Sequence, residues 1–377
     1  MGDLEAAITE IARDNLEREG WDTPLDYFNW GRDKRHKVDD TESLPKTPTE
    51  VLHRAWKSEV MQSVRSFFRR EAHAGSLKAT MSQFEKAFGS FDESYQLMSD
   101  RYSRNLFAEL IYMKLVSEKH MRLSSFTKEF IDSYEVASDM VLNSEETLPV
   151  YSWVLRKVTL TSPPVSFFVT PTILNLHLTG RLYRYQNGDV LIGVSGGDIV
   201  IDGGVGWGDT TIYLAALANE KAGGHLYAFD ILEEGMSALS EQIKANPGIT
   251  NITPILLGLS DIDGDRVSIS PPGPGASITK KHTGRTVETI TIDTFAEQRG
   301  LDKVDLIKMD IEGSEVPALI GATKTIQRHK PKLAISAYHK WDDLLIIPQE
   351  IHSIRDDYNY YLDCTTGFGG EAILYCI

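Results

Sequence analysis

The stretch Ile199-Val-Ile-Asp-Gly-Gly-Val-Gly-Trp-Gly-Asp-Thr-Thr211 decides the fold of this chain. It begins with three β-branched apolar residues, continues with an acid and four glycines, and ends in small polar residues. This order predicts a buried parallel strand, a tight loop and the first turn of a helix. Because glycine has no Cβ, the loop backbone can adopt positive φ and a ligand can lie against the main chain.

The carboxylates that flank the glycine loop indicate what it holds. A dinucleotide fingerprint needs glycines at offsets zero, two and five, and the third position is Asp209 or Thr211 in the two available registers. Asp202 and Asp209 would also repel a pyrophosphate. A cationic ligand fits better, and S-adenosylmethionine (SAM) carries both a sulfonium and an α-ammonium group.

Composition narrows the classes of partner and location. The chain has 377 residues, enough for two domains or one enlarged α/β domain. Its formal charge of −15 predicts no nucleic-acid or membrane partner and favours a small-molecule substrate. Two cysteines, Cys364 and Cys376, are too few for a disulfide framework or a zinc site. Free thiols and an N-terminus without signal-peptide features predict a cytoplasmic protein.

The apolar pattern divides the chain into three parts. Residues 1–150 are expected to be helical and to contact substrate or another subunit, which keeps a homo-oligomer open. Their aromatic stretch, residues 21–30, is interpreted as packing anchors, and the basic residues Lys34, Arg35 and Lys37 as a solvated loop. A β-rich lead-in over residues 151–197 is expected to hold strands at 154–160, 165–169, 173–178 and 182–185.

Residues 198–377 alternate apolar strands with amphipathic helices, so we expect βαβ units and a mostly parallel sheet covered on both faces. After the first strand, further strands are predicted at 226–229, 252–257, 304–309 and 332–337, with helices at 233–245 and 314–327. The second helix is expected to bury Val316, Leu319, Ile320 and Ile326. Residues 358–377 predict an antiparallel C-terminal hairpin, and residues 261–288 a mobile loop or a covering hairpin.

Ligands of an open α/β sheet bind beyond the carboxyl ends of its strands, so the residues there are the candidates for cofactor binding. Asp230 follows the second strand and is expected to accept hydrogen bonds from both ribose hydroxyls. Ser260 and Asp261 follow the third strand, where a backbone N–H and an acceptor can read an adenine edge. The glycine loop adds the candidates Asp202, Gly203, Gly204, Gly206, Trp207, Asp209 and Thr210.

The fourth and fifth strands end in candidate catalytic groups. Asp310, Glu312 and Glu315 crowd six positions, and we expect Asp310 to act in both cofactor binding and catalysis. Lys308 lies inside the apolar strand and needs a carboxylate partner. His339 follows the fifth strand and is a candidate general base, because an unperturbed histidine accepts a proton near neutral pH.

These motifs resemble the FkbM family of SAM-dependent methyltransferases over roughly residues 180–377. The resemblance is carried by Asp-Gly-Gly-x-Gly-Trp-Gly-Asp-Thr at 202–210, Ile-Asp-Thr-Phe at 292–295, Asp-Leu-Ile-Lys-Met-Asp-Ile-Glu-Gly-Ser-Glu at 305–315, Pro-Lys-Leu-Ala-Ile-Ser-Ala-Tyr-His at 331–339, and Ile347-Pro348. It implies a class I, Rossmann-like methyltransferase fold. It also implies methyl transfer to a hydroxyl oxygen, typically of a sugar or a polyketide-type natural product.

The leading hypothesis is therefore an O-methyltransferase in which His339, Asp310 or Glu312 accepts the proton of the substrate. In a second version these three residues hold a divalent metal, although no spacing motif demands one. An NAD(P)-dependent oxidoreductase is the rival from another class, and its third glycine is missing. A SAM-binding protein without catalysis, and nitrogen as the methylated atom, both stay open.

Overall fold

The computed structural model describes residues 3–4, 6–8, 10–11, 91–116, 123–125, 127–151, 153–273, 275–366 and 369–377. Two compact units divide the chain: Met1–Phe126 with Cys364–Ala372, and Thr127–Asp363 with Ile373–Ile377. The aromatic stretch at 21–30 and the basic residues Lys34, Arg35 and Lys37 lie outside the described residues. Within the described ranges, every helix is too short or too polar to cross a lipid bilayer.

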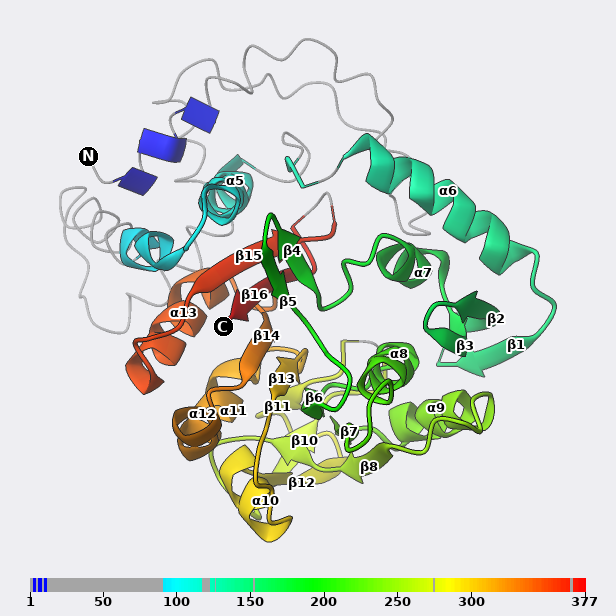
Figure 1. The fold of residues 1–377 in the computed structure, drawn as a ribbon. Helices are drawn as coiled ribbons and strands as arrows, with labels where there is room; N and C mark the ends of the chain where they lie inside the picture. Colours follow the sequence, from blue (N-terminus) through cyan, green and yellow to red (C-terminus); the bar gives the residue numbers. More distant parts are fainter. Residues whose placement is uncertain are drawn as a thin grey trace. The chain divides into compact units, whose positions relative to one another are not determined.

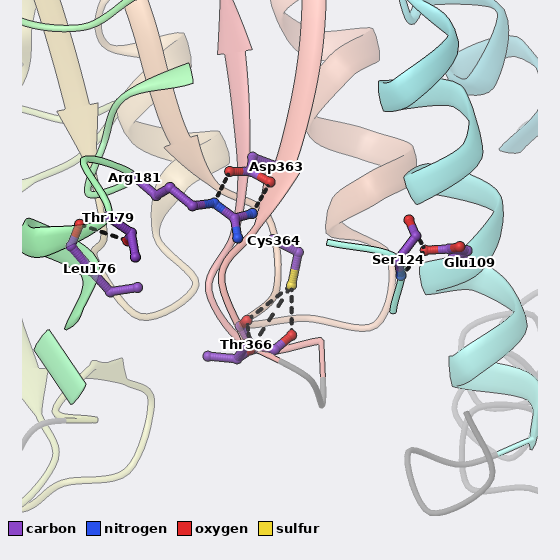
Figure 2. Close-up of polar contacts among 9 residues, drawn as sticks. Glu109, Ser124, Leu176, Thr179, Arg181, Asp363, Cys364 and Thr366 are labelled. Atoms are coloured by element: carbon purple, nitrogen blue, oxygen red, sulfur yellow. Dashed lines mark hydrogen bonds and ion pairs between the residues drawn. The ribbon is translucent and has the colours of Figure 1, made fainter. Parts of the chain in front are cut away.

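The first unit is built around helix α5 (Arg101–Val116). Its buried positions include Leu106, Leu110 and Ile111, which recur at helical spacing. Glu109 accepts hydrogen bonds from the backbone N–H and the hydroxyl of Ser124, both at 2.8 Å (Figure 2). This part of the expected helical region is therefore helical where the structure describes it.

A seven-stranded sheet forms the centre of the second unit, in the order β15-β16-β14-β13-β6-β7-β8 (Figure 1). Its strands are β6 (Ile199–Gly203), β7 (His225–Asp230), β8 (Ile252–Leu256), β13 (Leu306–Met309), β14 (Lys332–Ser336), β15 (Tyr360–Cys364) and β16 (Ala372–Cys376). The strands from β8 to β14 run parallel, and β16 is antiparallel to β14. The predicted α/β fold, with a mostly parallel sheet and an antiparallel C-terminal hairpin, is confirmed.

Strands β6 and β13 lie side by side in the middle of this sheet. Both are apolar and buried, with Val200, Ile201, Leu306 and Ile307 all at 0% exposure. From β6 the chain proceeds to its neighbour β7 on one side, whereas from β13 it proceeds to β14 on the other. The strand order therefore reverses between β6 and β13, and ligands of open α/β sheets bind at such a point.

Helices cover both faces of the sheet (Figure 1). One side carries α8 (Asp209–Ala218) and α9 (Glu233–Lys244). The other side carries α10 (Ile292–Gln298), α11 (Glu315–Ile320), α12 (Thr323–His329) and α13 (Asp343–Ile354). Both cysteines are buried and free, as expected.

The prediction of a single helix at 314–327 is wrong. The helix is interrupted at Gly321, which separates α11 from α12. A Cβ on Gly321 would lie 2.0 Å from the carbonyl oxygen of Ser260, so this turn passes close to the end of strand β9 (Gly258–Leu259). Asp293 then caps the start of α12 by accepting hydrogen bonds from the backbone N–H groups of Lys324 and Thr325. The break also leaves Ile320 43% exposed, contrary to its predicted burial.

One of the strands predicted in the lead-in segment is a helix in the structure. Strands β1 (Thr147–Val150), β2 (Trp153–Thr161) and β3 (Pro164–Val169) form an antiparallel sheet. The predicted strand at 173–178 is instead helix α7 (Pro171–Leu178). This helix packs against α6 (Lys128–Leu142). Thr170 caps α7 and Pro171 occupies its first turn, and both residues favour a helix start.

In place of the strand predicted at 182–185, the structure has β4 (Tyr185–Asn187), which begins at the last predicted residue and pairs with β5 (Val190–Ile192). The preceding turn, residues 179–184, is tied to the sheet by Arg181. This guanidinium forms a forked contact with the Asp363 carboxylate of β15, including an Nε to Oδ2 hydrogen bond of 3.0 Å (Figure 2).

The outer edge of β3 is closed by two amide side chains, one in α9 and one just beyond its C-terminal end. Gln242 accepts a hydrogen bond from the Phe168 N–H at 2.9 Å and donates one to the Phe168 carbonyl at 2.8 Å. Asn246, two residues after the end of α9, accepts a hydrogen bond from the Ser166 N–H at 2.8 Å and donates one to the Ser166 carbonyl. Each amide thus replaces a residue of a neighbouring strand.

Residues 261–288 contribute to a second sheet, in the order β11-β10-β12-β9. Its strands are β9 (Gly258–Leu259), β10 (Arg266–Ile269), β11 (Ile278–Thr279) and β12 (Thr286–Ile290). Strands β10 and β11 pair antiparallel, so the covering hairpin is the interpretation that the structure supports. Arg285 fastens this sheet to α9 through two hydrogen bonds to Glu234, of 2.9 and 2.8 Å.

Candidate functional site

The glycine loop, residues 203–208, joins β6 to α8 and is packed tightly at two of its glycines. A Cβ on Gly204 (φ +85) would lie 1.9 Å from the carbonyl oxygen of Asp310, and one on Gly208 (φ +79) 2.8 Å from Leu239 Cα. Gly206 (φ +58) differs, since a Cβ there would meet no described atom within 4 Å. The protein therefore leaves open space beside Gly206, where a ligand can approach the backbone.

Several backbone N–H groups of this loop already have acceptors within the protein. Gly204 donates to the Phe229 carbonyl at 2.9 Å. Val205 and Gly206 both donate to Oδ2 of Asp230, each at 3.0 Å. A pyrophosphate binds through unoccupied N–H groups and the positive end of a helix. Because two of these groups face a carboxylate, the loop suits a nicotinamide dinucleotide poorly.

Beneath the loop lies a fully buried ion pair. Lys308 on β13 is 2% exposed, Asp202 at the end of β6 is 0% exposed, and Nζ lies 3.0 Å from Oδ1. The same ammonium donates to the Gly203 carbonyl at 3.0 Å and to the Gly204 carbonyl. The prediction that Lys308 has a carboxylate partner is therefore confirmed, and the partner is Asp202.

This pair bears on the expectation that Asp202 attracts a cationic ligand. Its other oxygen accepts the Thr211 hydroxyl at 2.6 Å, so both carboxylate oxygens have contacts within the protein. Burial lowers the pKa of Lys308, but the charges of Asp202 and Asp310 outweigh it and hold the pKa above its usual value. The charge of Asp202 is thus neutralised below the loop and is not presented to a cationic ligand.

Asp230, at the end of β7, is similarly engaged. In addition to the two loop N–H groups, it accepts the Leu232 N–H on Oδ1 at 2.8 Å. A carboxylate offers about four acceptor positions. One position is left, so Asp230 can receive one further hydrogen bond in this arrangement, not the two expected from the ribose hydroxyls. Burial raises its pKa, whereas these N–H groups lower it, and the net shift is upward.

Other predicted cofactor contacts are occupied by protein neighbours. Ser260 donates its N–H to the Ile290 carbonyl at 3.1 Å and its hydroxyl to Asp261 at 3.1 Å, so this N–H cannot also read an adenine. Trp207 packs against Trp153, with ring centroids 5.4 Å apart.

Two polar side chains in the first turn of α8 are also buried or half-buried. Asp209 is buried, and its carboxylate lies 4.0 Å from the ring of His177. Burial raises the pKa of Asp209 to about 6. Thr210 is half-buried beside it. Cofactor contacts of these two side chains stay predictions.

Asp310, just past the end of β13, is held by donors from two other segments. Tyr183 donates to Oδ2 at 2.7 Å and Tyr338 to Oδ1 at 3.1 Å. The His339 ring lies 3.3 Å from Oδ1. Burial would raise the pKa of Asp310, but His339 and Lys308 outweigh it and hold the pKa well below its usual range. Asp310 is therefore ionised, and its side chain keeps 23% exposure.

Sequence reasoning gave no role to either tyrosine. Tyr338 lies beside His339 in a motif that was recognised, so its position could have drawn attention to it. Tyr183 lies 127 residues from Asp310 in the chain, and an isolated tyrosine in a turn carries no signal of such a contact.

His339 lies between carboxylates on both sides of its ring. Nδ1 is 3.0 Å from Glu315, and Nε2 is 3.5 Å from Glu312 as well as close to Asp310. Burial lowers the pKa of His339, but Asp310 and Glu315 raise it to about 11. A ring with this pKa carries its proton at neutral pH, which disfavours His339 as the general base, and its role in catalysis stays a prediction.

The same contacts bear on the metal alternative. A histidine ligand binds a metal through a ring nitrogen without a proton, and both nitrogens here face carboxylates. In the part of the chain that the structure describes, no three acidic, histidine or cysteine side chains are arranged to hold a metal ion.

Glu312 is the titratable group of this cluster that is poised near neutral pH. It occupies the turn after β13 with φ +56, a conformation that is uncommon for residues other than glycine. Burial raises its pKa to about 7, with Asp310 and Glu315 adding to the effect and His339 opposing it. Its side chain is 30% exposed. Asp310 and Glu312 thus share one turn, yet their surroundings push their pKa values apart, which is how enzymes separate the roles of two carboxylates.

Comparisons with known proteins match this part of the chain. Residues 197–360 fit the family model described as the methyltransferase FkbM domain. The hexuronic acid methyltransferase AglP of Haloferax volcanii is 30% identical over 116 residues, which are 30% of this chain and 46% of that protein. The chain therefore matches about half the length of this curated relative.

Two solved structures are also similar. A crystal structure of methyltransferase FkbM from Methylobacillus flagellatus KT shares 22% identity and a TM-score of 0.48, over 78% of this chain and 59% of that one. Fibrillarin of Aeropyrum pernix, in complex with SAM, shares 15% identity and a TM-score of 0.32, over 49% of this chain and 69% of that one.

Proposed function

Residues 197–360 are an FkbM methyltransferase domain whose cofactor is SAM, and from this premise we propose that the chain methylates a hydroxyl oxygen of a small polar molecule. The observation that carries the proposal is the pair of carboxylates after β13. Asp310 is held ionised, and Glu312 is poised to take up a proton near pH 7. Methylation of a hydroxyl by SAM is favoured by two groups: a negative charge near the cationic methyl donor, and a base that takes up the hydroxyl proton.

The residues at the switch point fit the cofactor. The space beside Gly206 admits a ligand to the backbone, Asp230 keeps one acceptor position, and Asp310 offers a negative charge. When bound, SAM supplies a methyl group on a positively charged sulfur. We assign the attraction of this charge to Asp310, because its side chain keeps 23% exposure, whereas Asp202 is fully buried against Lys308 below the loop.

Glu312 is the proposed general base. With SAM bound, the acceptor oxygen would form a bond to the methyl carbon while the sulfur–carbon bond breaks and S-adenosylhomocysteine leaves as a neutral thioether. The hydroxyl proton would pass to the Glu312 carboxylate. A positioned base of this kind contributes about 10²- to 10⁴-fold to a rate. His339 stays protonated, and its charge keeps Asp310 and Glu312 in place.

A sugar-like hydroxyl compound is the acceptor class that we propose. The net charge of −15 disfavours nucleic acids, and the relative named above is a hexuronic acid methyltransferase. Its short matched region supports the class of acceptor only as a proposal. A cytoplasmic location and a possible homo-oligomer stay predictions as well.

The test compares methyl transfer from labelled SAM to a panel of sugar hydroxyls and amines. We expect labelled methyl ethers from the wild type, and a loss of about 10²- to 10⁴-fold in kcat for Glu312→Gln with SAM affinity retained. Glu297→Gln, on the exposed part of α10, is the matched control and should leave the rate unchanged. Products methylated on nitrogen, or full activity of Glu312→Gln, would contradict the proposal.

A further inference from the structure

The turn between α7 and β4, residues 179–184, is fixed at two points. Arg181 holds one end through its fork on Asp363 (Figure 2). Tyr183 holds the other through its hydrogen bond to Asp310 at 2.7 Å. Tyr183 is 5% exposed and has φ +45, which bulky side chains rarely adopt. Such a conformation persists only where surrounding contacts impose it, and it is common at functional sites.

Tyr183 contacts both charged groups that govern this site. Its ring centroid lies 5.0 Å from Nζ of Lys308, the cation below the glycine loop. Its hydroxyl donates to Oδ2 of Asp310, whereas Tyr338 and His339 contact Oδ1. A hydrogen bond to an ionised carboxylate is stronger and more directional than one between neutral groups. Tyr183 therefore restrains the Oδ2 side of the carboxylate, whereas Tyr338 and His339 contact its Oδ1 side.

We propose that Tyr183 is a positioning residue that fixes Asp310 in the orientation that receives the cationic cofactor. This inference rests on the proposed function, from which it takes the contact between Asp310 and SAM. It extends the site beyond the matched domain, because residue 183 precedes the segment 197–360. The lead-in turn is then part of the cofactor site and not only a connection to the sheet.

A cycle of four proteins tests the coupling: wild type, Tyr183→Phe, Asp310→Ala and the double variant, each titrated with SAM by calorimetry. Tyr183→Phe should weaken SAM binding about 10-fold or more in the wild-type background, the value of a hydrogen bond to a charged group. With Asp310 replaced by alanine, the same change should weaken binding less than about two-fold, because residues that act through one another are not additive.

Tyr358→Phe is the matched control. The Tyr358 hydroxyl is also buried and donates a hydrogen bond, of 2.6 Å, to the Pro331 carbonyl. Removing it loses a comparable hydrogen bond of the same unit without touching Asp310, so SAM affinity should be unchanged.

The pH dependence of SAM affinity separates positioning from general damage. The groups that face Asp310 are Tyr183, Tyr338, His339, Lys308 and Glu312. The Tyr183 hydrogen bond lowers the pKa of Asp310. Without it this pKa rises, so Tyr183→Phe should lose SAM affinity at a higher pH than the wild type as the solution is acidified. A merely structural loss would lower affinity equally at every pH.

Two results would overturn the role of Tyr183: an equal loss of affinity in both backgrounds, or an equal loss in Tyr358→Phe. The proposed function is judged separately by methyl transfer. A protein that shows the coupling but never methylates a hydroxyl refutes only the proposed function. One that methylates hydroxyls without the coupling refutes only the role of Tyr183.

Discussion

Replacing Lys308 by methionine should destabilise the protein by about 4 to 6 kcal/mol. Methionine has a similar volume, so the change removes the charge and the donors with little loss of packing. Removing one member of a buried ion pair costs about 3 to 5 kcal/mol, since the other charge stays buried without a partner. Lys308 and Asp202 are 2% and 0% exposed, so solvent cannot reach either group in the folded state.

The rest of the loss comes from the glycine loop. Lys308 donates to the carbonyls of Gly203 and Gly204. Gly203 keeps a second donor, the Asp310 N–H at 2.9 Å, so its carbonyl stays satisfied. The Gly204 carbonyl loses its ammonium donor, which adds about 1 kcal/mol. The total is a large fraction of the 5 to 15 kcal/mol that typical domains possess.

Urea unfolding, followed by circular dichroism, measures the effect. The double variant Asp202→Asn with Lys308→Met should recover at least about 2 kcal/mol, because it removes the uncompensated charge while asparagine can still accept the Thr211 hydroxyl. Lys128→Met is the control at an exposed pair: the side chains of Lys128 and its partner Asp132 are 79% and 58% exposed, so the change should leave the urea midpoint nearly unchanged. A cost below 1 kcal/mol for Lys308→Met, or no recovery in the double variant, would refute the reasoning.

Three further predictions concern the rate and the packing. Burial raises the pKa of Glu312 to about 7, so kcat should rise with pH up to that value and level off above it; a flat profile between pH 5.5 and 8 would remove Glu312 as base. Gly204→Ala should prevent stable folding, because a Cβ 1.9 Å from the Asp310 carbonyl cannot be accommodated, whereas Gly206→Ala should fold and weaken SAM binding, as thermal melting and calorimetry will show. Gln242→Ala should lower the unfolding free energy by about 1 to 3 kcal/mol, because it leaves the Phe168 N–H and carbonyl unpaired; an unchanged urea midpoint would mean that water replaces the amide.

Elements that depend on local pattern were predictable from the sequence. The apolar run at 199–201 and the glycines after it locate β6, the loop and α8 without reference to distant residues. The C-terminal hairpin is predictable for the same reason, as its two β-rich runs flank a glycine turn. Helix α7 shows the limit of this approach: residues 173–178 alternate as a strand does, but the cap at Thr170 and the proline after it start a helix.

The chemistry of the site depends on contacts between distant residues, and sequence position alone could not supply it. His339 has an ordinary histidine pKa until Asp310 and Glu315 approach both sides of its ring. Asp202 reads as a free acid until Lys308 is found beneath it, 106 positions later in the chain. The sequence therefore indicated where the polar groups gather, whereas their protonation states follow from the fold.

Helix α9 contacts both the small β1-β2-β3 sheet and the glycine loop. Its Gln242 seals the edge of β3 and also donates to the Trp207 carbonyl at 3.2 Å, while its Leu239 packs against Gly208. An exposed strand edge invites pairing with foreign chains. A one-residue insertion in α9 would rotate these side chains by about 100°, and so would open a site for aggregation and disturb the loop in the same event. We therefore expect the length of α9 to tolerate less change during protein engineering than the surface loops of the same unit.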